Sequence, residues 1–155
     1  MPRQQFAESN HSAVVLLVGP REDVLLVIEH TKPLPHYWKC PGGEGEGAET
    51  PLQTALREVK EETGIPLDPA NVVQIGEPVM LGEREHHKYH FLARVSSWKG
   101  LLERGDEGEE VREWQLSMLG RLNILPPQWK FWSAHRAQLA AHGVLLPLSR
   151  EEGGN

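Results

Sequence analysis

Glu58, Glu61 and Glu62 are the residues of this sequence whose type and spacing point most directly to chemistry. They are spaced at i, i+3 and i+4, so on a helix they would project from one face. Like charges at this spacing destabilise a helix, and carboxylates near its C-terminal end oppose the helix dipole. Local stability therefore does not explain them, whereas Mg²⁺ prefers carboxylate oxygens together with water and substrate phosphates. The pattern alone leaves both a metal site and a solvated acidic face open.

The neighbouring residues predict a helix over residues 51–63, which would carry these glutamates. Thr50 is a favourable N-cap, Pro51 suits the first turn, and Gln53 stands at the spacing of a capping box. Gly64 suits the left-handed conformation that ends many helices. A largely apolar stripe at spacings of three and four predicts the face that packs on the core: Leu52, Ala55, Leu56, Val59 and Thr63.

The rest of the chain alternates between strand-like runs and turns, which predicts an α+β fold with a mixed β-sheet. Aliphatic and β-branched runs predict strands at residues 12–18, 24–29, 72–81, 88–95 and 110–116. Residues 30–43 are rich in proline and glycine and predict a loop, and residues 127–142 predict a second helix. A length of 155 residues without a repeat predicts one domain over residues 1–155, with flexible tails at 1–10 and 149–155.

The composition argues against several classes of protein. A formal net charge of -6 and scattered arginines disfavour nucleic-acid binding, which depends on contacts to phosphates. No apolar run approaches the roughly 20 residues that a bilayer requires, and the N-terminus lacks the apolar segment of a secretory signal. The lone cysteine, Cys40, excludes an intrachain disulfide and suits a reducing compartment. We therefore expect a cytoplasmic monomer or homodimer with a small-molecule substrate and no membrane partner.

A longer pattern surrounds the glutamates. It reads Gly43, five residues, Glu49, seven residues, then Arg57-Glu58-Val59-x-Glu61-Glu62-x-Gly64-Ile65. All nine positions match the Nudix signature, so the chain resembles a MutT-like Nudix hydrolase. The resemblance implies a Nudix-type α/β/α sandwich with a mixed β-sheet, in which this loop and helix are the catalytic segment. It also implies a pyrophosphohydrolase that depends on Mg²⁺, with Mn²⁺ as a substitute, and uses water to attack phosphorus.

The resemblance assigns roles to individual residues of the signature. Glu58 and Glu62 would be the main metal ligands, and Glu61 would be a further ligand or a catalytic support. The carbonyl oxygen of Gly43 could also coordinate, because glycine lets the backbone approach an ion closely. Arg57 would orient one of the glutamates instead of touching the substrate.

The general base and the substrate contacts are less well determined. The base would be a signature glutamate or a carboxylate of the loop before the last strand, where Glu107 and Glu109 are the preferred residues. Tyr37 and Trp38 could stack on a nucleobase, with packing of the loop as the alternative. Arg84 could contact a phosphate, with a solvated cation as the alternative.

The resemblance leaves the substrate open between a (d)NTP and a nucleoside diphosphate sugar such as ADP-ribose. A catalytically silent domain of Nudix fold that senses a nucleotide is the alternative function. A protein-protein module that docks through its aromatic last helix is a second alternative. The complete set of signature carboxylates favours the enzyme, because a domain that only binds does not need a whole metal site.

Overall fold

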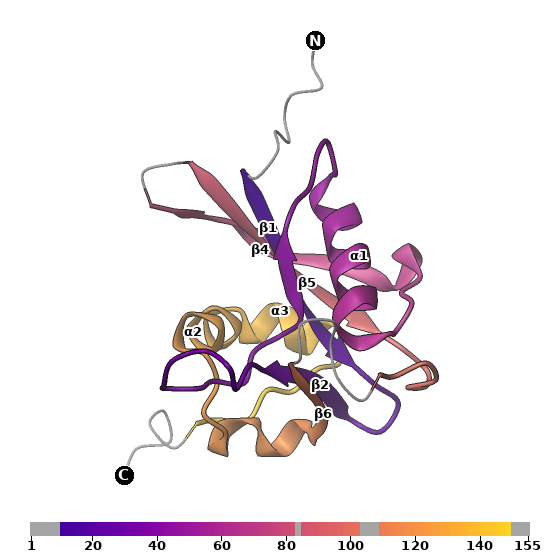
Figure 1. Cartoon of the computed structure of the whole chain (residues 1–155). Coiled ribbons are helices and arrows are strands. Elements are labelled where there is room, and N and C mark those ends of the chain that lie inside the picture. Colours follow the sequence, from indigo (N-terminus) through magenta and orange to yellow (C-terminus); the bar gives the residue numbers. More distant parts are fainter. Residues whose placement is uncertain (1–9, 83–84, 103–108, 150–155) are drawn as a thin grey trace.

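The computed structural model describes residues 10–82, 85–102 and 109–149. Its strands form one mixed six-stranded sheet of order β4-β5-β1-β2-β6, with β3 pairing on β1 (Figure 1). β1 and β5 run parallel, and the other paired strands run antiparallel. The strands are β1 (His11–Val18), β2 (Asp23–Ile28), β3 (Gly42–Glu44), β4 (Val72–Leu81), β5 (His86–Arg94) and β6 (Glu110–Gln115). The predicted mixed sheet of an α+β fold is confirmed.

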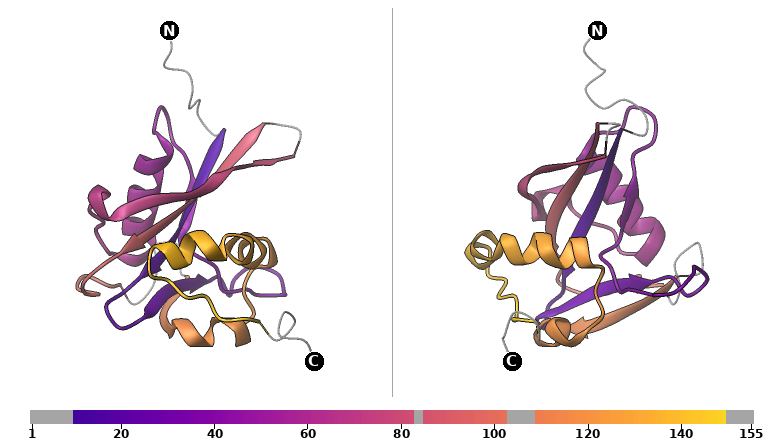
Figure 2. Two further views of the ribbon diagram at one scale, coloured as in Figure 1. Left: turned by 180° about the vertical axis from the view of Figure 1, so that it is seen from behind. Right: turned by 90° about the vertical axis from the view of Figure 1, so that its left-hand side faces the viewer.

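Helices cover both faces of this sheet. The helices are α1 (Pro51–Thr63), α2 (Pro126–Ala134) and α3 (Arg136–Ala141), with 3-10 turns η2 (Pro69–Asn71) and η3 (Leu116–Arg121). Figures 1 and 2 show α1 on one side and the pair α2 and α3 on the other. Within the described residues, no helix is long and apolar enough to cross a membrane.

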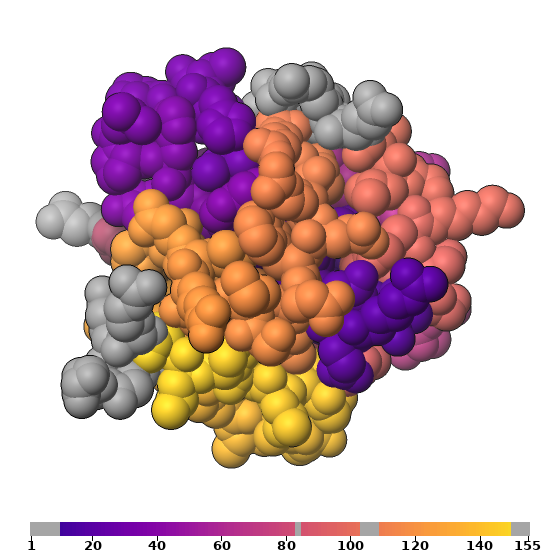
Figure 3. Space-filling view, turned by 90° about the horizontal axis from the view of Figure 1, so that it is seen from below, coloured from indigo at the N-terminus to yellow at the C-terminus, as the bar shows by residue number. Residues whose placement is uncertain are grey.

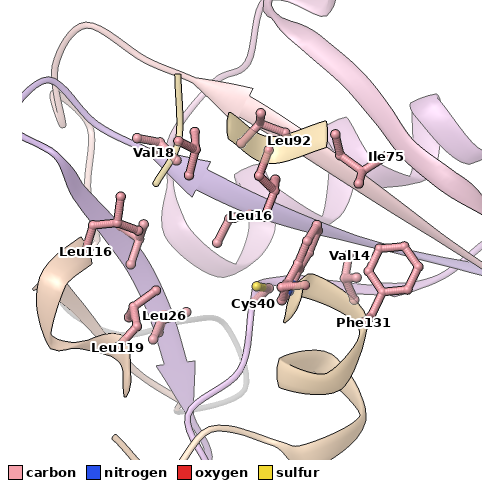
Figure 4. Close-up of a cluster of buried hydrophobic side chains, with 14 residues drawn as sticks. Val14, Leu16, Val18, Leu26, Cys40, Ile75, Leu92, Leu116, Leu119 and Phe131 are labelled. Carbon is pink, nitrogen blue, oxygen red and sulfur yellow. The ribbon is translucent and has the colours of Figure 1, made fainter. Parts of the chain in front are cut away.

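Strand β1 is the middle strand of the sheet, and both of its faces are buried. Alternate residues of a strand point to opposite faces. On one face, Ala13, Val15 and Leu17 share a core cluster with Ala55 and Val59 of α1. On the other face, a second cluster joins the sheet to the C-terminal helices (Figure 4): Val14, Leu16, Val18, Cys40, Phe131, Trp132 and Leu139 are among its members.

Helix α1 begins and ends where the sequence predicts. The Gln53 N–H donates to Thr50 Oγ1 at 3.2 Å, and the Thr50 N–H donates to Gln53 Oε1 at 2.9 Å, so the capping box is complete. Gly64 has φ 83°, and its N–H donates to the carbonyl of Lys60 at 2.9 Å. A residue with a side chain is strained in this left-handed conformation, which explains the glycine.

The single helix predicted over residues 127–142 is wrong, because α2 and α3 are separated at His135. His135 has φ -112° and ψ 26°, outside the helical region. Its Nδ1–H donates to the carbonyl of Phe131 at 2.8 Å, and its ring stacks on Phe131 with centroids 4.0 Å apart. The ring also fills the space beside Gly76 of β4, where an added Cβ would lie 2.5 Å from Nε2. A contact with a distant strand therefore accompanies the break.

The loop predicted over residues 30–43 is wrong at its end, where Gly42 and Gly43 begin β3. Two glycines give this short strand no propensity of its own, and pairing with β1 creates it. The tails predicted at residues 1–10 and 149–155 fall mainly outside the described residues. Asn10 is described, and its carbonyl accepts the N–H of His87 at 3.0 Å.

Candidate functional site

Strand β3 brings the signature glycine against the first signature glutamate. Gly43 pairs with Ala13 of β1, and both residues face α1. A Cβ added to Gly43 would lie 2.4 Å from Cδ of Glu58, so a larger residue would collide with this carboxylate. The backbone of Gly43 and the carboxylate of Glu58 are therefore in contact. Their proximity agrees with the metal-binding roles inferred for both residues, which stay predictions.

Glu62 lies one turn after Glu58 on α1, and the charges of neighbouring carboxylates act on it. Its Oε1 accepts the N–H of Gly42 at 3.1 Å. The pKa of Glu62 is raised to about 8, mainly by burial and also by the charges of Glu58 and Glu109, while the Gly42 hydrogen bond and the charge of Lys39 oppose the shift. The three carboxylates thus interact electrostatically although α1 and the segment before β6 are far apart in sequence. A bound cation would lower the cost of ionising Glu62.

Arg57 is the main cation among these carboxylates, and its first partner is Glu49. Its Nε donates to Glu49 Oε2 at 2.6 Å, and its Nη2 donates to Glu49 Oε1 at 3.1 Å. Its Nη1 lies 3.1 Å from both Glu58 Oε2 and Glu61 Oε1. The hydrogen bond from Arg57 is the largest cause that lowers the pKa of Glu49 to about 2. Arg57 therefore contacts two glutamates of the signature helix, Glu58 and Glu61, and it also anchors the loop through Glu49.

The donor chemistry of the site fits a hard divalent cation. Glu58, Glu61, Glu62 and Glu109 supply carboxylate oxygens, and Gly43 supplies a closely approaching backbone. In the part of the chain that the structure describes, no three His, Cys, Asp or Glu side chains are already grouped to hold a metal. Arg57 contacts the carboxylates of Glu58 and Glu61, and the Gly42 N–H donates to Glu62.

Of the two residues preferred for the general base, the structure describes only one. Glu107 lies outside the described residues. Glu109 is described, is only 4% exposed, and acts electrostatically on Glu62. A buried carboxylate beside another carboxylate is unusual for a solvated acidic loop. The surroundings of Glu109 therefore favour a function for it, although its role as the base stays a prediction.

The residues inferred to contact the substrate are only partly described. Arg84 lies outside the described residues, and Tyr37 is half-buried. Trp38 packs edge-to-face on Trp114 with ring centroids 5.3 Å apart, and the Arg112 guanidinium lies 5.7 Å from the Trp38 centroid. The backbone of Trp38 also bonds to Asn123 and Leu125 at 2.9 Å each. Packing of the loop thus accounts for much of Trp38, and stacking on a nucleobase stays a prediction for Tyr37 and Trp38.

Lys39 is a residue of this site that the sequence analysis missed. Its charge acts on Glu62 and also on Lys88, a half-buried residue of β5 whose pKa is lowered mainly by burial. Lys39 immediately precedes the Cys40-Pro41-Gly42-Gly43 segment. A cation next to a glycine-rich turn was therefore the signal that could have identified it.

Two cavities lie apart from the carboxylates. One, of about 640 Å³, lies between η3, α2 and the C-terminal segment, on the lower face where orange and yellow atoms meet in Figure 3. Another, of about 580 Å³, lies between the C-terminal end of α1 and the segment after β5. Neither is lined by Glu58, Glu62 or Glu109, so neither cavity identifies the substrate site.

Comparison with known proteins relates most of the described fold to one family. The family model described as NUDIX domain matches residues 9–140. Human 8-oxo-dGDP phosphatase NUDT18 is 26% identical over 141 residues, which cover 86% of this chain and 42% of that protein. The chain thus spans less than half the length of this curated relative.

Solved structures share the arrangement of strands and helices. The Nudix hydrolase RenU from M. smegmatis has a TM-score of 0.67 at 21% identity, covering 88% of this chain and 89% of that chain. The NUDIX domain of Shewanella oneidensis NrtR, solved in complex with ADP ribose, has a TM-score of 0.66 at 18% identity, covering 90% and 93%. At these identities the likeness concerns the fold, and it confirms the predicted sandwich.

Proposed function

This chain belongs to the NUDIX domain family, and we propose that it is a metal-dependent hydrolase that cleaves a diphosphate within a small nucleotide. The observation that supports this proposal most is the cluster of two glutamates of α1 against β3, where the carboxylate of Glu58 lies beside Gly43 and the carboxylate of Glu62 accepts the Gly42 N–H. Such a cluster is costly for folding alone, and a divalent cation would offset the cost.

Under this proposal, Glu58 and Glu62 hold Mg²⁺ or Mn²⁺, with Glu61 and the Gly43 carbonyl as further ligands. When bound, the cation neutralises phosphate charge and lowers the pKa of water. Arg57 keeps Glu58 and Glu61 in position from the side of the Glu49 ion pair.

Glu109 is our proposed general base, with Glu107 as the alternative from the same loop. An oxygen-phosphorus bond forms between water and one phosphorus, and the phosphoanhydride bond to the leaving phosphate breaks. The leaving oxygen keeps the electron pair of that bond, and the base carboxylate accepts a proton of the water. The burial of Glu109 would restrict the access of bulk water to this proton transfer.

We propose a (d)NTP or a nucleoside diphosphate sugar as the substrate class. A neighbour of the same fold solved with ADP ribose supports the nucleoside diphosphate sugar, whereas the relative named an 8-oxo-dGDP phosphatase supports more generally a nucleotide that contains a diphosphate. Lys39 and Lys88 are half-buried cations that could meet a phosphate, together with Arg84, while Tyr37 and Trp38 could stack on the base. We also propose a single domain over residues 1–155, a cytoplasmic location, and a monomer or homodimer without nucleic-acid or membrane partners.

A nucleotide panel tests this function. Wild-type protein is incubated with Mg²⁺ or Mn²⁺ and with dNTPs, 8-oxo-dGDP, 8-oxo-dGTP or ADP-ribose, and the products are separated by chromatography. We expect hydrolysis at a phosphoanhydride bond, and the pair of products identifies which bond breaks. The matched control is Glu62→Gln, which keeps the size of the side chain and removes a proposed ligand.

The sensor alternative gives a different result in the same experiment. Tight binding of a nucleotide without turnover at micromolar protein would support the sensor and contradict the enzyme.

A further inference from the structure

A chain of hydrogen bonds, buried at its His11 end, links the central strand β1 to Arg57. His11 Nε2 lies 2.8 Å from Thr54 Oγ1, and the Thr54 hydroxyl donates to Glu49 Oε1 at 2.8 Å. Glu49 in turn accepts from Arg57 Nε at 2.6 Å. His11 is 1% exposed and Thr54 is fully buried. Neither residue is a fixed position of the signature, so the sequence pattern did not point to them.

The direction of these bonds follows from the hydroxyl group. Thr54 has one hydroxyl proton, and it is donated to the carboxylate of Glu49. The oxygen of Thr54 can therefore only accept from His11, so Nε2 of His11 carries the proton. Glu49 Oε1 also accepts the N–H of Glu46 at 2.9 Å. Its carboxylate is thus held by Thr54, by the backbone of Glu46 and by Arg57.

The ring of His11 also supports the loop that follows β3. A Cβ added to Gly45 would lie 2.3 Å from both Cε1 and Nε2 of His11, so the loop passes directly over the ring. The Gly45 N–H donates to the carbonyl of His11 at 2.9 Å. The position of His11 therefore sets both the loop and, through Thr54, the carboxylate of Glu49.

We propose that His11 and Thr54 are positioning residues that fix Glu49 and thereby aim Arg57 at the metal-binding carboxylates. Arg57 contacts Glu58 and Glu61 at 3.1 Å each, so a displaced Glu49 would let the guanidinium move relative to both. This inference rests on the proposed metal-dependent function. It adds that residues outside the signature determine how readily the carboxylates accept the cation.

The test compares Thr54→Val with Thr54→Ser in the full chain. Valine has nearly the shape of threonine but no hydroxyl, so it breaks the chain of hydrogen bonds, whereas serine retains it. Affinity for Mn²⁺ is measured by electron paramagnetic resonance of the free ion, alongside kcat and thermal unfolding. Residues behind metal ligands typically affect affinity by about 10- to 100-fold, so we expect Thr54→Val to weaken Mn²⁺ binding on the order of tenfold. Thr54→Ser should bind like the wild type.

A second pair keeps the test decisive if Thr54→Val does not fold. His11→Leu removes the donor to Thr54, and His11→Gln retains an amide donor. We expect weaker Mn²⁺ binding for leucine and rescue by glutamine. A merely structural role predicts lower thermal stability with unchanged Mn²⁺ affinity of the folded protein, and that result would overturn the inference.

The wild type separates this inference from the proposed function. Mn²⁺ binding and turnover by the wild type, with equal Mn²⁺ affinity in the valine and serine variants, overturns the positioning role alone. Absence of both Mn²⁺ binding and turnover in the wild type overturns the proposed function and the positioning role together.

Discussion

Glu49 and Glu62 show how one residue type acquires opposite properties within a single site. The hydrogen bond from Arg57 is the main cause that lowers the pKa of Glu49 to about 2, so this carboxylate is charged throughout the neutral range. Burial is the main cause that raises the pKa of Glu62 to about 8. Glu49 already pairs with the guanidinium of Arg57. The ionised form of Glu62, by contrast, would be stabilised by a bound metal cation. Their spacing in the sequence predicts the cluster, but only burial and partners distinguish the two roles.

Replacing Glu62 by glutamine should abolish most of the activity and leave the fold intact. Even residues behind metal ligands cost about 10- to 100-fold, so we expect kcat to fall on the order of 100-fold or more. The metal-free variant should unfold at a higher temperature at pH 9, because a half-buried charge has been removed. Steady-state rates with Mn²⁺ and thermal unfolding in EDTA measure the two effects. Glu113→Gln, at an exposed position of β6, is the control for the change in charge, and full activity of Glu62→Gln would contradict the metal assignment.

The raised pKa of Glu62 also predicts how metal binding depends on pH. In the metal-free protein, the folded state holds this proton up to about pH 8, while the unfolded chain releases it near the ordinary value of 4.5. The stabilising contribution is therefore fully present below pH 4.5 and is lost as the pH rises through 8. Below pH 8, a metal must displace the proton, so Mn²⁺ affinity should increase with pH and level off above 8.

Calorimetric titration with Mn²⁺ at pH 6.5, in two buffers of different ionisation enthalpy, measures the released proton directly. We expect about one proton per metal ion at pH 6.5 and almost none at pH 9. In Glu62→Gln the dependence on the buffer should disappear. A wild type whose binding enthalpy is the same in both buffers at pH 6.5 would show that Glu62 is already ionised.

At the scale of the elements, local signals predicted α1 well and the C-terminal helices poorly. The cap at Thr50, the end at Gly64 and the apolar stripe all lie within α1 or next to it. The break at His135 instead coincides with contacts to Phe131 and to Gly76 of a distant strand, which no local pattern reveals. Strand β3 was missed for a similar reason, since its glycines become a strand only through pairing with β1.

The end of α1 should be sensitive to the loss of glycine. Gly64→Ala would place a side chain at φ 83° and its Cβ 2.3 Å from the carbonyl oxygen of Gly100. The left-handed conformation alone costs about 1–2 kcal/mol, and overpacking commonly adds about 1–3 kcal/mol. Gly47→Ala is the matched control, because Gly47 has φ 56° with no atom near an added Cβ. Urea unfolding should show a larger loss for Gly64→Ala, and equal losses would mean that Gly100 moves away without cost.

At the scale of the whole molecule, the site exists only because distant segments meet. The signature could be recognised in residues 43–65, and the mixed sheet followed from the strand-like runs. The sequence could not decide between Glu107 and Glu109, because that choice depends on how the segment before β6 reaches α1. β6 pairs with β2 from Asp23 to Ile28, and Glu109 immediately precedes this pairing. The fold thus places Glu109 close enough to Glu62 for its charge to raise the pKa of Glu62. Local sequence patterns do not reveal this proximity.

This placement leads to a prediction about the general base. General base catalysis typically contributes about 10²- to 10⁴-fold, so Glu109→Gln should lower kcat by an amount in that range. Glu109 is not one of the main ligands we propose, so Mn²⁺ affinity should change much less than in Glu62→Gln. The same measurements on Glu107→Gln distinguish the two carboxylates, and we expect the smaller loss of kcat there. A larger loss for Glu107→Gln would assign the base to Glu107, and the burial of Glu109 would then serve the electrostatics of Glu62 instead of proton transfer.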